Sequence, residues 1–273
     1  MAEIDVQRLA EILRHAAKAE VMPRFRRLDD GAVRQKTEAI DLVTEADEQA
    51  EHLIRAEVAG LWPEALFVGE ESVAADPALL DRLDTAELAV VVDPVDGTAN
   101  FAAGLPLFAT MASVVRGGEV IAGIIYDPMG DDWVMAEKGA GAWLRRPDGG
   151  DERLRVAVAP ELSQMVGTVS IAFLPMANKP TIMANLAKVR LAANYRVAGH
   201  DYRLFAGGHT HFTAYNKLMP WDHLAGTLIS QEAGGYAARF DGSPYLPIHR
   251  GGGLLVAPDR DTWHLLRTEV FTV

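Results

Sequence analysis

Cysteine is absent from the 273-residue sequence. Its absence excludes disulfide bonds, thiolate nucleophiles and zinc–sulfur sites, so any bound metal has to be held by oxygen or imidazole ligands. The first twenty residues mix acidic with apolar side chains and lack the continuous apolar core that a signal peptide needs. We therefore expect a cytoplasmic protein.

Long apolar runs and an excess of basic residues are also absent. No stretch approaches the ~20 apolar residues of a membrane-spanning helix. The 26 Lys and Arg residues are outnumbered by 38 Asp and Glu residues, which gives a formal net charge of -12. This charge attracts neither nucleic acid nor an anionic membrane, so neither is an expected partner. Carboxylates that surround divalent cations would still accept an anionic phosphate, because the ions invert the local field.

The first half of the chain has the pattern of two helices followed by a sheet. Apolar residues at helical spacing predict a helix over residues 4–22 and a second from Thr44 to Pro63, where Thr44 and Asp47 form a capping-box pattern. Short apolar runs between turn residues predict strands at 65–68, 88–92, 108–116, 119–126, 132–137, 142–145 and 153–158. This half should carry a mostly antiparallel sheet.

After residue 158 the pattern changes to an alternation of strands and helices. The predicted strands are 166–173, 194–197, 211–215, 236–239 and 254–257, and the predicted helices are 180–191, 201–206, 222–233 and 259–269. This alternation indicates a layered α/β half. Because domains cluster around ~100–150 residues, we expect two sub-domains that share one core, at residues 1–158 and 159–273.

The segment that begins at Asp93 carries the strongest chemical signal. Asp93 and Asp96 follow a predicted buried strand across a proline-containing turn, which can aim both acids and the carbonyl of Val95 at one point. Oxygen ligands of this kind suit magnesium. Gly97 lets backbone N–H groups approach an anion, and the hydroxyl of Thr98 can orient water. Taken alone, Asp-Pro-x-Asp-Gly is more often an ordinary turn.

Three further segments carry acids that are candidates for the same site. Glu70 and Glu71 follow another predicted strand, Asp47 lies in the first turn of a helix, and Asp222 opens the helix over 222–233. Each also has a simple structural explanation, as a solvated loop acid, a partner of the helix dipole or an N-cap. The combination of segments decides between these readings.

Four segments occur together in a characteristic order: Asp-x-Val-Thr-x-x-Asp at 41–47, Gly-Glu-Glu-Ser at 69–72, Asp-Pro-Val-Asp-Gly-Thr-x-Asn-Phe at 93–101 and Trp-Asp-x-x-x-Gly at 221–226. The set resembles the inositol monophosphatase family over nearly the whole chain. The resemblance implies an α+β and α/β layered α-β-α-β-α sandwich of the inositol monophosphatase and fructose-1,6-bisphosphatase type. It also implies a homodimer and a phosphatase that lithium inhibits.

The same resemblance implies a magnesium site with two ions and a looser third ion near Glu70. Glu70, Asp93 and the Val95 carbonyl would bind the first ion, and Asp93, Asp96 and Asp222 the second. The two ions would clamp the attacking and leaving oxygens of an in-line displacement at phosphorus.

The catalytic residues that the resemblance implies are Asp47, Thr98 and Glu70. Asp47 and Thr98 would orient and deprotonate the attacking water. The activity would be hydrolysis of a small phosphorylated metabolite, and the chemistry is consistent with the residues present, because clustered cations neutralise the phosphate and make hydroxide available near neutral pH.

The sequence departs from the family at the positions that contact the alcohol. Inositol-hydrolysing members carry a glutamate seven residues before the Trp-Asp aspartate, and Tyr215 stands there in this chain. The upstream Gly-Thr/Ser-Ala segment is replaced by residues 198–203. The candidates for substrate contact are His200, Asp201, Arg203, Tyr215 and Lys217.

These residues leave several substrates open. Asp201 or Tyr202 could receive a cationic or imidazole-bearing alcohol such as histidinol, while Arg203 or Lys217 could take the second phosphate of 3′-phosphoadenosine 5′-phosphate. Each could also be an ordinary exposed position. His209 and His211 would alternate on one strand face, where two surface histidines are a simpler interpretation than a metal pair.

A binding role is the alternative from another class. Some bacterial relatives of the family associate with the transcription machinery, and the present chain could do the same. The complete set of acidic candidates favours catalysis, and the acidic charge gives no sign of a nucleic-acid surface.

Overall fold

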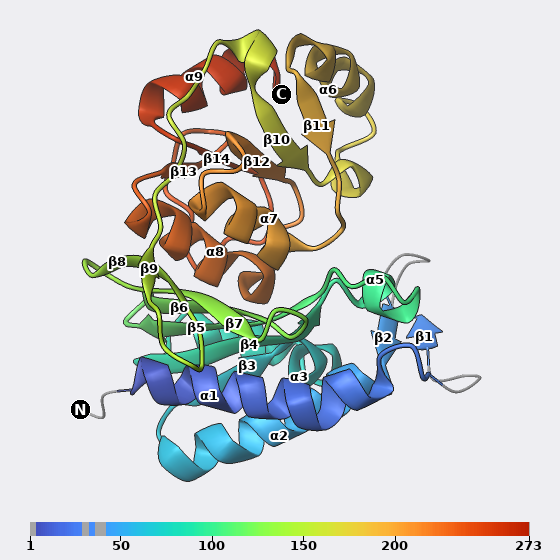
Figure 1. The fold of residues 1–273 in the computed structure, drawn as a ribbon, viewed down its shortest axis with the longest axis vertical. Coiled ribbons are helices and arrows are strands. Elements are labelled where there is room, and N and C mark those ends of the chain that lie inside the picture. The colour runs from blue at the N-terminus through green and yellow to red at the C-terminus, as the bar shows by residue number, and fades with distance from the viewer. Residues whose placement is uncertain (1–3, 29–32, 36–41, 273) are drawn as a thin grey trace.

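The computed structural model describes residues 4–28, 33–35 and 42–272. Helices and sheets alternate in five layers, as Figure 1 shows from the helices α1 and α2 at one end to α6 and α9 at the other. This arrangement confirms the expected layered α-β-α-β-α sandwich. Asp41, the first residue of the motif at 41–47, lies outside the described residues.

The first layer consists of two helices that pack on a sheet. Helix α1 (Val6–Ala16) continues into a π-helical turn (Ala17–Val21) and a 3-10 turn (Met22–Arg24), and α2 spans Glu45–Leu61. Their apolar faces, which include Leu9, Leu13 and Ile54, are fully buried against the sheet. The predicted capping box of Thr44 and Asp47 is present at the start of α2. A small ribbon of β1 (Val33–Gln35) and β2 (Leu42–Thr44) precedes it.

The second layer is a seven-stranded sheet in the order β3-β4-β5-β6-β7-β8-β9. Its strands are β3 (Leu66–Gly69), β4 (Leu88–Asp96), β5 (Ala109–Arg116), β6 (Glu119–Asp127), β7 (Asp132–Glu137), β8 (Gly141–Arg145) and β9 (Glu152–Arg153). Only the β3–β4 pair is parallel among these seven described strands, which confirms a mostly antiparallel sheet. Short helices α3 (Glu70–Ala75) and α4 (Ala78–Leu83) connect β3 to β4, and α5 (Thr98–Ala102) connects β4 to β5.

The remaining layers belong to the second half of the chain. A five-stranded sheet has the order β11-β10-β12-β14-β13, with β10 at Val166–Val169, β11 at Leu191–Ala193, β12 at Phe212–Tyr215, β13 at Tyr236–Arg239 and β14 at Leu254–Ala257. Helices α7 (Ala198–Ala206) and α8 (Pro220–Glu232) lie between the two sheets, whereas α6 (Lys179–Asn185) and α9 (Arg260–Glu269) cover the outer face. The boundary expected at residue 158 falls in the segment between the sheets, and the division into sub-domains stays a prediction.

Helix α8 approaches the first sheet closely because Gly123 on β6 has no side chain. A Cβ atom at this position would lie 2.7 Å from the carbonyl oxygen of Ala225 on α8. The close approach matters because α8 carries Asp222 in its first turn.

Several predicted bounds in both halves were wrong. Strand β4 continues through Asp96 instead of ending at Val92, and the strand expected over 153–158 is only the two-residue β9. The strand expected at 194–197 lies at Leu191–Ala193, and β10 ends at Val169 before a 3-10 turn at Ile171–Phe173.

The strand expected from residue 211 begins at Phe212, so His209 and His211 do not alternate on a strand face. Both lie in the turn before β12. His211 has a structural partner there, because its Nδ1 atom accepts a hydrogen bond from the backbone N–H of Val166. The simpler interpretation of these histidines therefore fits the structure better than a metal pair.

Candidate active site

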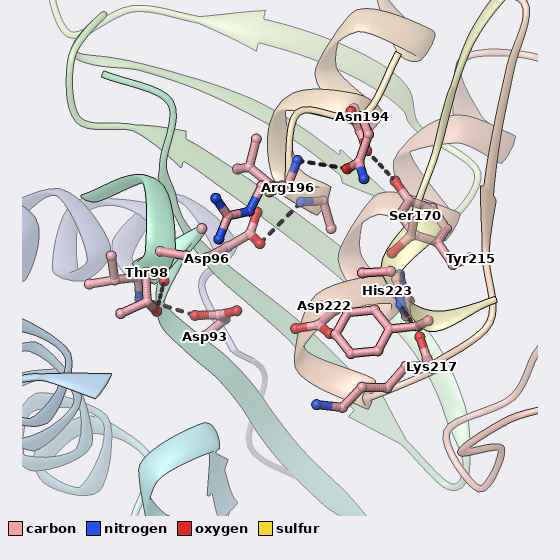
Figure 2. A pocket seen from close by; sticks show the side chains of 18 of the residues that line it. Asp93, Asp96, Thr98, Ser170, Asn194, Arg196, Tyr215, Lys217, Asp222 and His223 are labelled. Carbon is pink, nitrogen blue, oxygen red and sulfur yellow. Dashed lines mark hydrogen bonds between the residues drawn. The ribbon is translucent and has the colours of Figure 1, made fainter. Parts of the chain in front are cut away.

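A pocket of about 180 Å³ lies where the ends of β3 and β4 meet the starts of α7 and α8. Figure 2 shows that both halves of the chain contribute side chains to it. The pocket brings together ten of the residues selected from the sequence: Glu70, Asp93, Val95, Asp96, Gly97, Thr98, Asp201, Tyr215, Lys217 and Asp222. Asp47 lies directly behind the lining, in contact with Thr98.

An irregularity in β4 places the two acids of the Asp-Pro-Val-Asp motif. The pairing register between β4 and β5 shifts between Asp93 and Asp96, so the strand bulges there. The bulge accommodates Pro94, which has no N–H to donate to the sheet, while its carbonyl accepts a hydrogen bond from Thr110 Oγ1 at 2.9 Å. The N–H of Val95 donates to Asp93 Oδ1 at 3.0 Å. The local backbone therefore holds both acids at the end of the strand.

Asp96 connects the two halves of the chain. Its carboxylate accepts hydrogen bonds from the backbone N–H groups of Ala198 and Gly199, at 3.1 and 2.5 Å. These are free donors at the start of α7, so Asp96 caps that helix from a position about one hundred residues earlier. This tertiary cap explains why α7 begins at Ala198 and not at the expected residue 201.

Thr98 and Asp47 form a hydrogen-bonded pair beside the acids. Thr98 Oγ1 lies 2.9 Å from Asp47 Oδ1 and 2.9 Å from the carbonyl oxygen of Val95. The other carboxylate oxygen, Asp47 Oδ2, accepts from the backbone N–H and the hydroxyl of Thr44. Burial is the main cause that raises the pKa of Asp47 to about 6. A carboxylate with that pKa can accept a proton near neutral pH.

The carboxylates in the pocket repel one another. Burial, and then the charge of Glu70, raises the pKa of Asp93 and of Asp222 well above the usual range, and Asp96 adds to both shifts. Burial likewise raises the pKa of Asp96 to about 7, although the N–H groups of α7 act in the opposite direction. The cluster therefore has to take up protons or positive charge.

The chemistry of this cluster fits a hard divalent cation. Within residues 4–28, 33–35 and 42–272, no group of three or more acidic or imidazole side chains is already arranged to hold a metal ion. The donors in the pocket are nevertheless carboxylates and a backbone carbonyl, which are the ligands that magnesium prefers. The raised pKa values of Asp93 and Asp222, to which burial and the charges of Glu70 and Asp96 contribute, indicate a deficit of positive charge that a cation would fill.

Two of the residues selected for substrate contact lie outside the pocket lining. His200 Nε2 pairs with the carbonyl oxygen of Phe108 at 3.2 Å. The guanidinium of Arg203 forms an ion pair with Asp132 at 2.5 Å and also donates to the carbonyl of Ile125. Both side chains face the seven-stranded sheet and do not line the pocket.

Asp201 and Tyr215 line the pocket but contact each other. Tyr215 OH donates to Asp201 Oδ2 at 3.4 Å, and its ring lies 4.4 Å from that of His223. Asp201 is 4% exposed, and its Oδ1 atom is buried without a hydrogen-bond partner among the described residues. Burial raises its pKa well above the usual range. Neither polar group is turned to solvent in the pocket.

Several residues of the lining were not predicted from the sequence: Leu42, Ser170, Phe173, Asn194, Arg196 and His223. Arg196 has a positive φ of 59°, a sign that only a few per cent of non-glycine residues adopt. His223 is buried and its pKa is lowered to about 4 by burial, so it is neutral. The adjacent Trp-Asp motif was the available signal for His223, whereas no local pattern pointed to Arg196.

The five-layer fold and the acidic pocket between its sheets define a protein of the inositol monophosphatase and fructose-1,6-bisphosphatase fold type. The chain matches the model of the inositol monophosphatase family over residues 5–269 and belongs to this family. It is 32% identical over 206 residues to an inositol-1-monophosphatase of Mesorhizobium japonicum, covering 74% of this chain and 73% of the relative.

Two further comparisons agree with this family. The Nus factor SuhB of Vibrio cholerae is 31% identical over 206 residues, covering 74% of this chain and 73% of that protein. The solved structure of an IMPase from Thermotoga maritima superposes with a TM-score of 0.80 at 25% identity, covering 97% of this chain and 94% of the other. No helix among the described residues is long and apolar enough to cross a membrane.

Proposed function

We propose that the chain is a magnesium-dependent phosphomonoesterase that hydrolyses a small phosphorylated metabolite. The observation that carries the proposal is the meeting of Asp93, Asp96 and Asp222 in one pocket, next to the hydrogen-bonded pair of Thr98 and Asp47. The acids provide a place for cations, and the pair provides a proton acceptor beside it. Membership of the inositol monophosphatase family supports the same activity.

The residues that would hold magnesium come from both halves of the chain. Glu70, Asp93 and the Val95 carbonyl would hold one ion, and Asp93, Asp96 and Asp222 a second, with room for a looser third near Glu70. When bound, the ions supply Lewis-acid chemistry that neutralises the phosphate and lowers the pKa of water. The raised pKa values of the acids mean that cation binding displaces protons from the cluster.

Thr98 and Asp47 would activate the attacking water. Thr98 has one hydroxyl proton, and when it donates this proton to Asp47 Oδ1 its oxygen can accept a proton from water. The water oxygen then forms the new bond to phosphorus as the P–O ester bond breaks. The water proton passes through Thr98 to Asp47, and the departing alkoxide takes up a proton from solvent.

The test is release of inorganic phosphate, with and without magnesium, from inositol 1-phosphate, histidinol phosphate, 3′-phosphoadenosine 5′-phosphate, fructose 1,6-bisphosphate and a generic aryl phosphate. We expect turnover only with magnesium, and loss of at least about a hundredfold in Asp93→Asn and Asp222→Asn. Asp241→Asn is the matched control, because Asp241 is an exposed acid on a remote turn. Turnover at the wild-type rate in both pocket variants would refute the proposal.

The natural ester is a separate question. The first relative reported above is named an inositol-1-monophosphatase, and we include an inositol phosphate in the proposal on that ground. Tyr215, which replaces the inositol-contacting glutamate, directs its hydroxyl to Asp201. The part of the pocket around Tyr215 therefore differs from that of inositol-hydrolysing members. Histidinol phosphate and 3′(2′),5′-bisphosphate nucleotides therefore remain alternative substrates. A homodimer and inhibition by lithium stay predictions.

A second candidate function is a binding role in transcription. It is favoured by one observation, the similarity to a protein named Nus factor SuhB. A pull-down of transcription proteins that is equally strong for the wild type and for Asp93→Asn would support this role, because it would be independent of the acidic pocket. If the wild type captures none of these proteins, the binding role is refuted and catalysis stands alone.

A further inference from the structure

Two cationic side chains, Arg196 and Lys217, line a pocket whose other charged residues are acids. They enter from different elements: Arg196 precedes α7, and Lys217 follows β12. Figure 2 shows Arg196 on the side of the pocket that carries Asp96 and Thr98, and Lys217 on the side that carries Asp222. In a chain with a formal net charge of -12, two cations at one acidic pocket call for an explanation.

Arg196 is held in an uncommon conformation by its neighbour. Its φ of 59° lies in the left-handed region, which costs a non-glycine residue of order 1 kcal/mol or more. The Oδ1 atom of Asn194 accepts the backbone N–H of Arg196 and closes this turn. The guanidinium itself forms no ion pair or hydrogen bond with any described residue and is exposed to solvent. The turn therefore directs an unpaired cation at the pocket.

Lys217 is also placed by its surroundings. Its carbonyl oxygen pairs with Nε2 of the buried His223 at 2.9 Å, which fixes the loop between β12 and α8. Its Nζ atom lies 5.2 Å from the centroid of the Phe173 ring. The charge of Lys217 lowers the pKa of Asp222, which places it within electrostatic reach of the acids. No carboxylate among the described residues forms an ion pair with it.

A cationic alcohol would find no exposed acid among the described residues of the pocket lining beyond the metal-binding acids. Asp201 is the acid that could receive a cationic alcohol, but it is 4% exposed and its Oδ1 atom is buried. The hydroxyl of Tyr215 occupies its other oxygen. The exposed charges beyond the metal-binding acids are therefore positive.

We propose that Arg196 and Lys217 form a second anion site, so that the preferred substrate is a phosphate ester whose alcohol carries another anionic group, a phosphate or a carboxylate. This inference rests on the proposed function and specifies its substrate class. Arg196 would bind the second anion through two parallel N–H donors, and Lys217 would contribute a compact charge from the side of the pocket that carries Asp222. Neither residue takes part in the transfer of a proton or of the phosphoryl group.

The experiment uses pairs of esters that differ in the second anion alone. Fructose 1,6-bisphosphate is compared with fructose 1-phosphate, and 3-phosphoglycerate with glycerol 3-phosphate, with magnesium and with product analysis by chromatography. The first pair tests a phosphate and the second a carboxylate. The variants are Arg196→Ala, Lys217→Met and their combination. Arg190→Ala is the control, because Arg190 is an exposed cation outside the pocket lining.

We expect the wild type to prefer the anion-bearing ester in at least one pair. Each single variant should lower kcat/KM for that ester about threefold to tenfold, the range for partly exposed charge-assisted contacts. For the ester that lacks the second anion, kcat/KM should change less than about twofold. Equal losses on both members of a pair would overturn the inference, because the two cations would then act on the transferred phosphate. A wild type without any preference, or an equal effect of Arg190→Ala, would also overturn it.

A binding measurement decides the inference independently of turnover. The affinity for fructose 6-phosphate is measured by calorimetry with magnesium and saturating inorganic phosphate, which fills the catalytic position. We expect weaker binding in Arg196→Ala and Lys217→Met than in Arg190→Ala, and unchanged binding would overturn the second anion site. If no ester is hydrolysed while these binding differences are present, the proposed function fails and the anion site stands.

Discussion

Glu51 should be required for the position of Glu70, although it lies outside the pocket lining. Its side chain projects from α2 and is 3% exposed. The carboxylate accepts hydrogen bonds from the backbone N–H groups of Glu71 and Ser72, each at 2.7 Å, and from the hydroxyl of Ser72. These donors belong to the first turn of α3, the helix that begins at Glu70. Glu51 therefore caps the segment that presents a candidate metal ligand.

Glu51→Gln keeps the shape of the side chain and removes its charge. One of the two oxygens becomes an NH₂ group, so the amide cannot accept from both sides of the turn. Hydrogen bonds to a charged group contribute about 1.5–3 kcal/mol each, and burial, which raises the pKa of Glu51, offsets part of this stabilisation. We expect the free energy of unfolding to fall by about 2 kcal/mol, and the affinity for magnesium to fall because Glu70 is no longer fixed.

Urea unfolding gives the stability change, and calorimetric titration gives the affinity for magnesium. Glu48→Gln is the control, because Glu48 lies on the same helix and its half-exposed carboxylate pairs with Arg34 at the surface. If Glu51→Gln unfolds within about 0.5 kcal/mol of the wild type and binds magnesium with the same affinity, Glu51 does not position Glu70, since a surface substitution would do as little.

Three further predictions test neighbouring parts of the site. Gly69→Ala should destabilise the fold by about 1–3 kcal/mol, because the new Cβ would lie 2.2 Å from the carboxyl carbon of Glu51, and urea unfolding should show a smaller loss in a Glu51→Ala background. Thr98→Val should lower kcat about a hundredfold or more and leave the melting temperature nearly unchanged, because it removes the hydroxyl between water and Asp47; a loss below about twofold would exclude the proton path. Burial raises the pKa of Asp47 to about 6 and of Asp96 to about 7, above unfolded values near ~4. The stability that these protons contribute is complete below about pH 4 and is lost as the pH rises through 6 and 7, so in EDTA the melting temperature should fall from pH 5 to pH 8, and magnesium should raise it more at pH 8. A melting temperature that is flat over this range would contradict the assignment.

The acidic half of the site could be predicted from the sequence because its geometry is local. Asp93, Val95, Asp96 and Thr98 lie within six residues at the end of one strand, so whatever places one of them places the others. The strand itself was predicted to end too early. Its extension through Asp96 depends on a bulge against β5, and the proline at position 94 concealed it, since proline within a predicted strand normally marks its end.

The part of the pocket proposed to contact the substrate could not be predicted, because the positions of its residues depend on tertiary contacts. The residues before α7 have the composition of a strand, but Arg196 adopts a left-handed turn and the helix begins at Ala198 under the carboxylate of Asp96. Once α7 lies between the two sheets, residues next to each other in sequence face different layers. Asp201 faces the pocket, whereas His200 and Arg203 face the first sheet and bond to it. These three side chains were predicted together because they are close in sequence, but the helical period directs them to different sides of α7.

The position of the site follows from how the two halves are joined. β4 ends in Asp96, and the carboxylate that would serve as a metal ligand also caps α7 of the other half. Asp222 comes from α8, which reaches the first sheet because Gly123 leaves room for its backbone. The same contacts that pack the halves together therefore bring like charges to one point, where they raise one another's pKa. Repulsion of this kind destabilises the contact between the two halves unless cations are bound. Magnesium should therefore stabilise the fold through the same acids that the proposed catalysis uses.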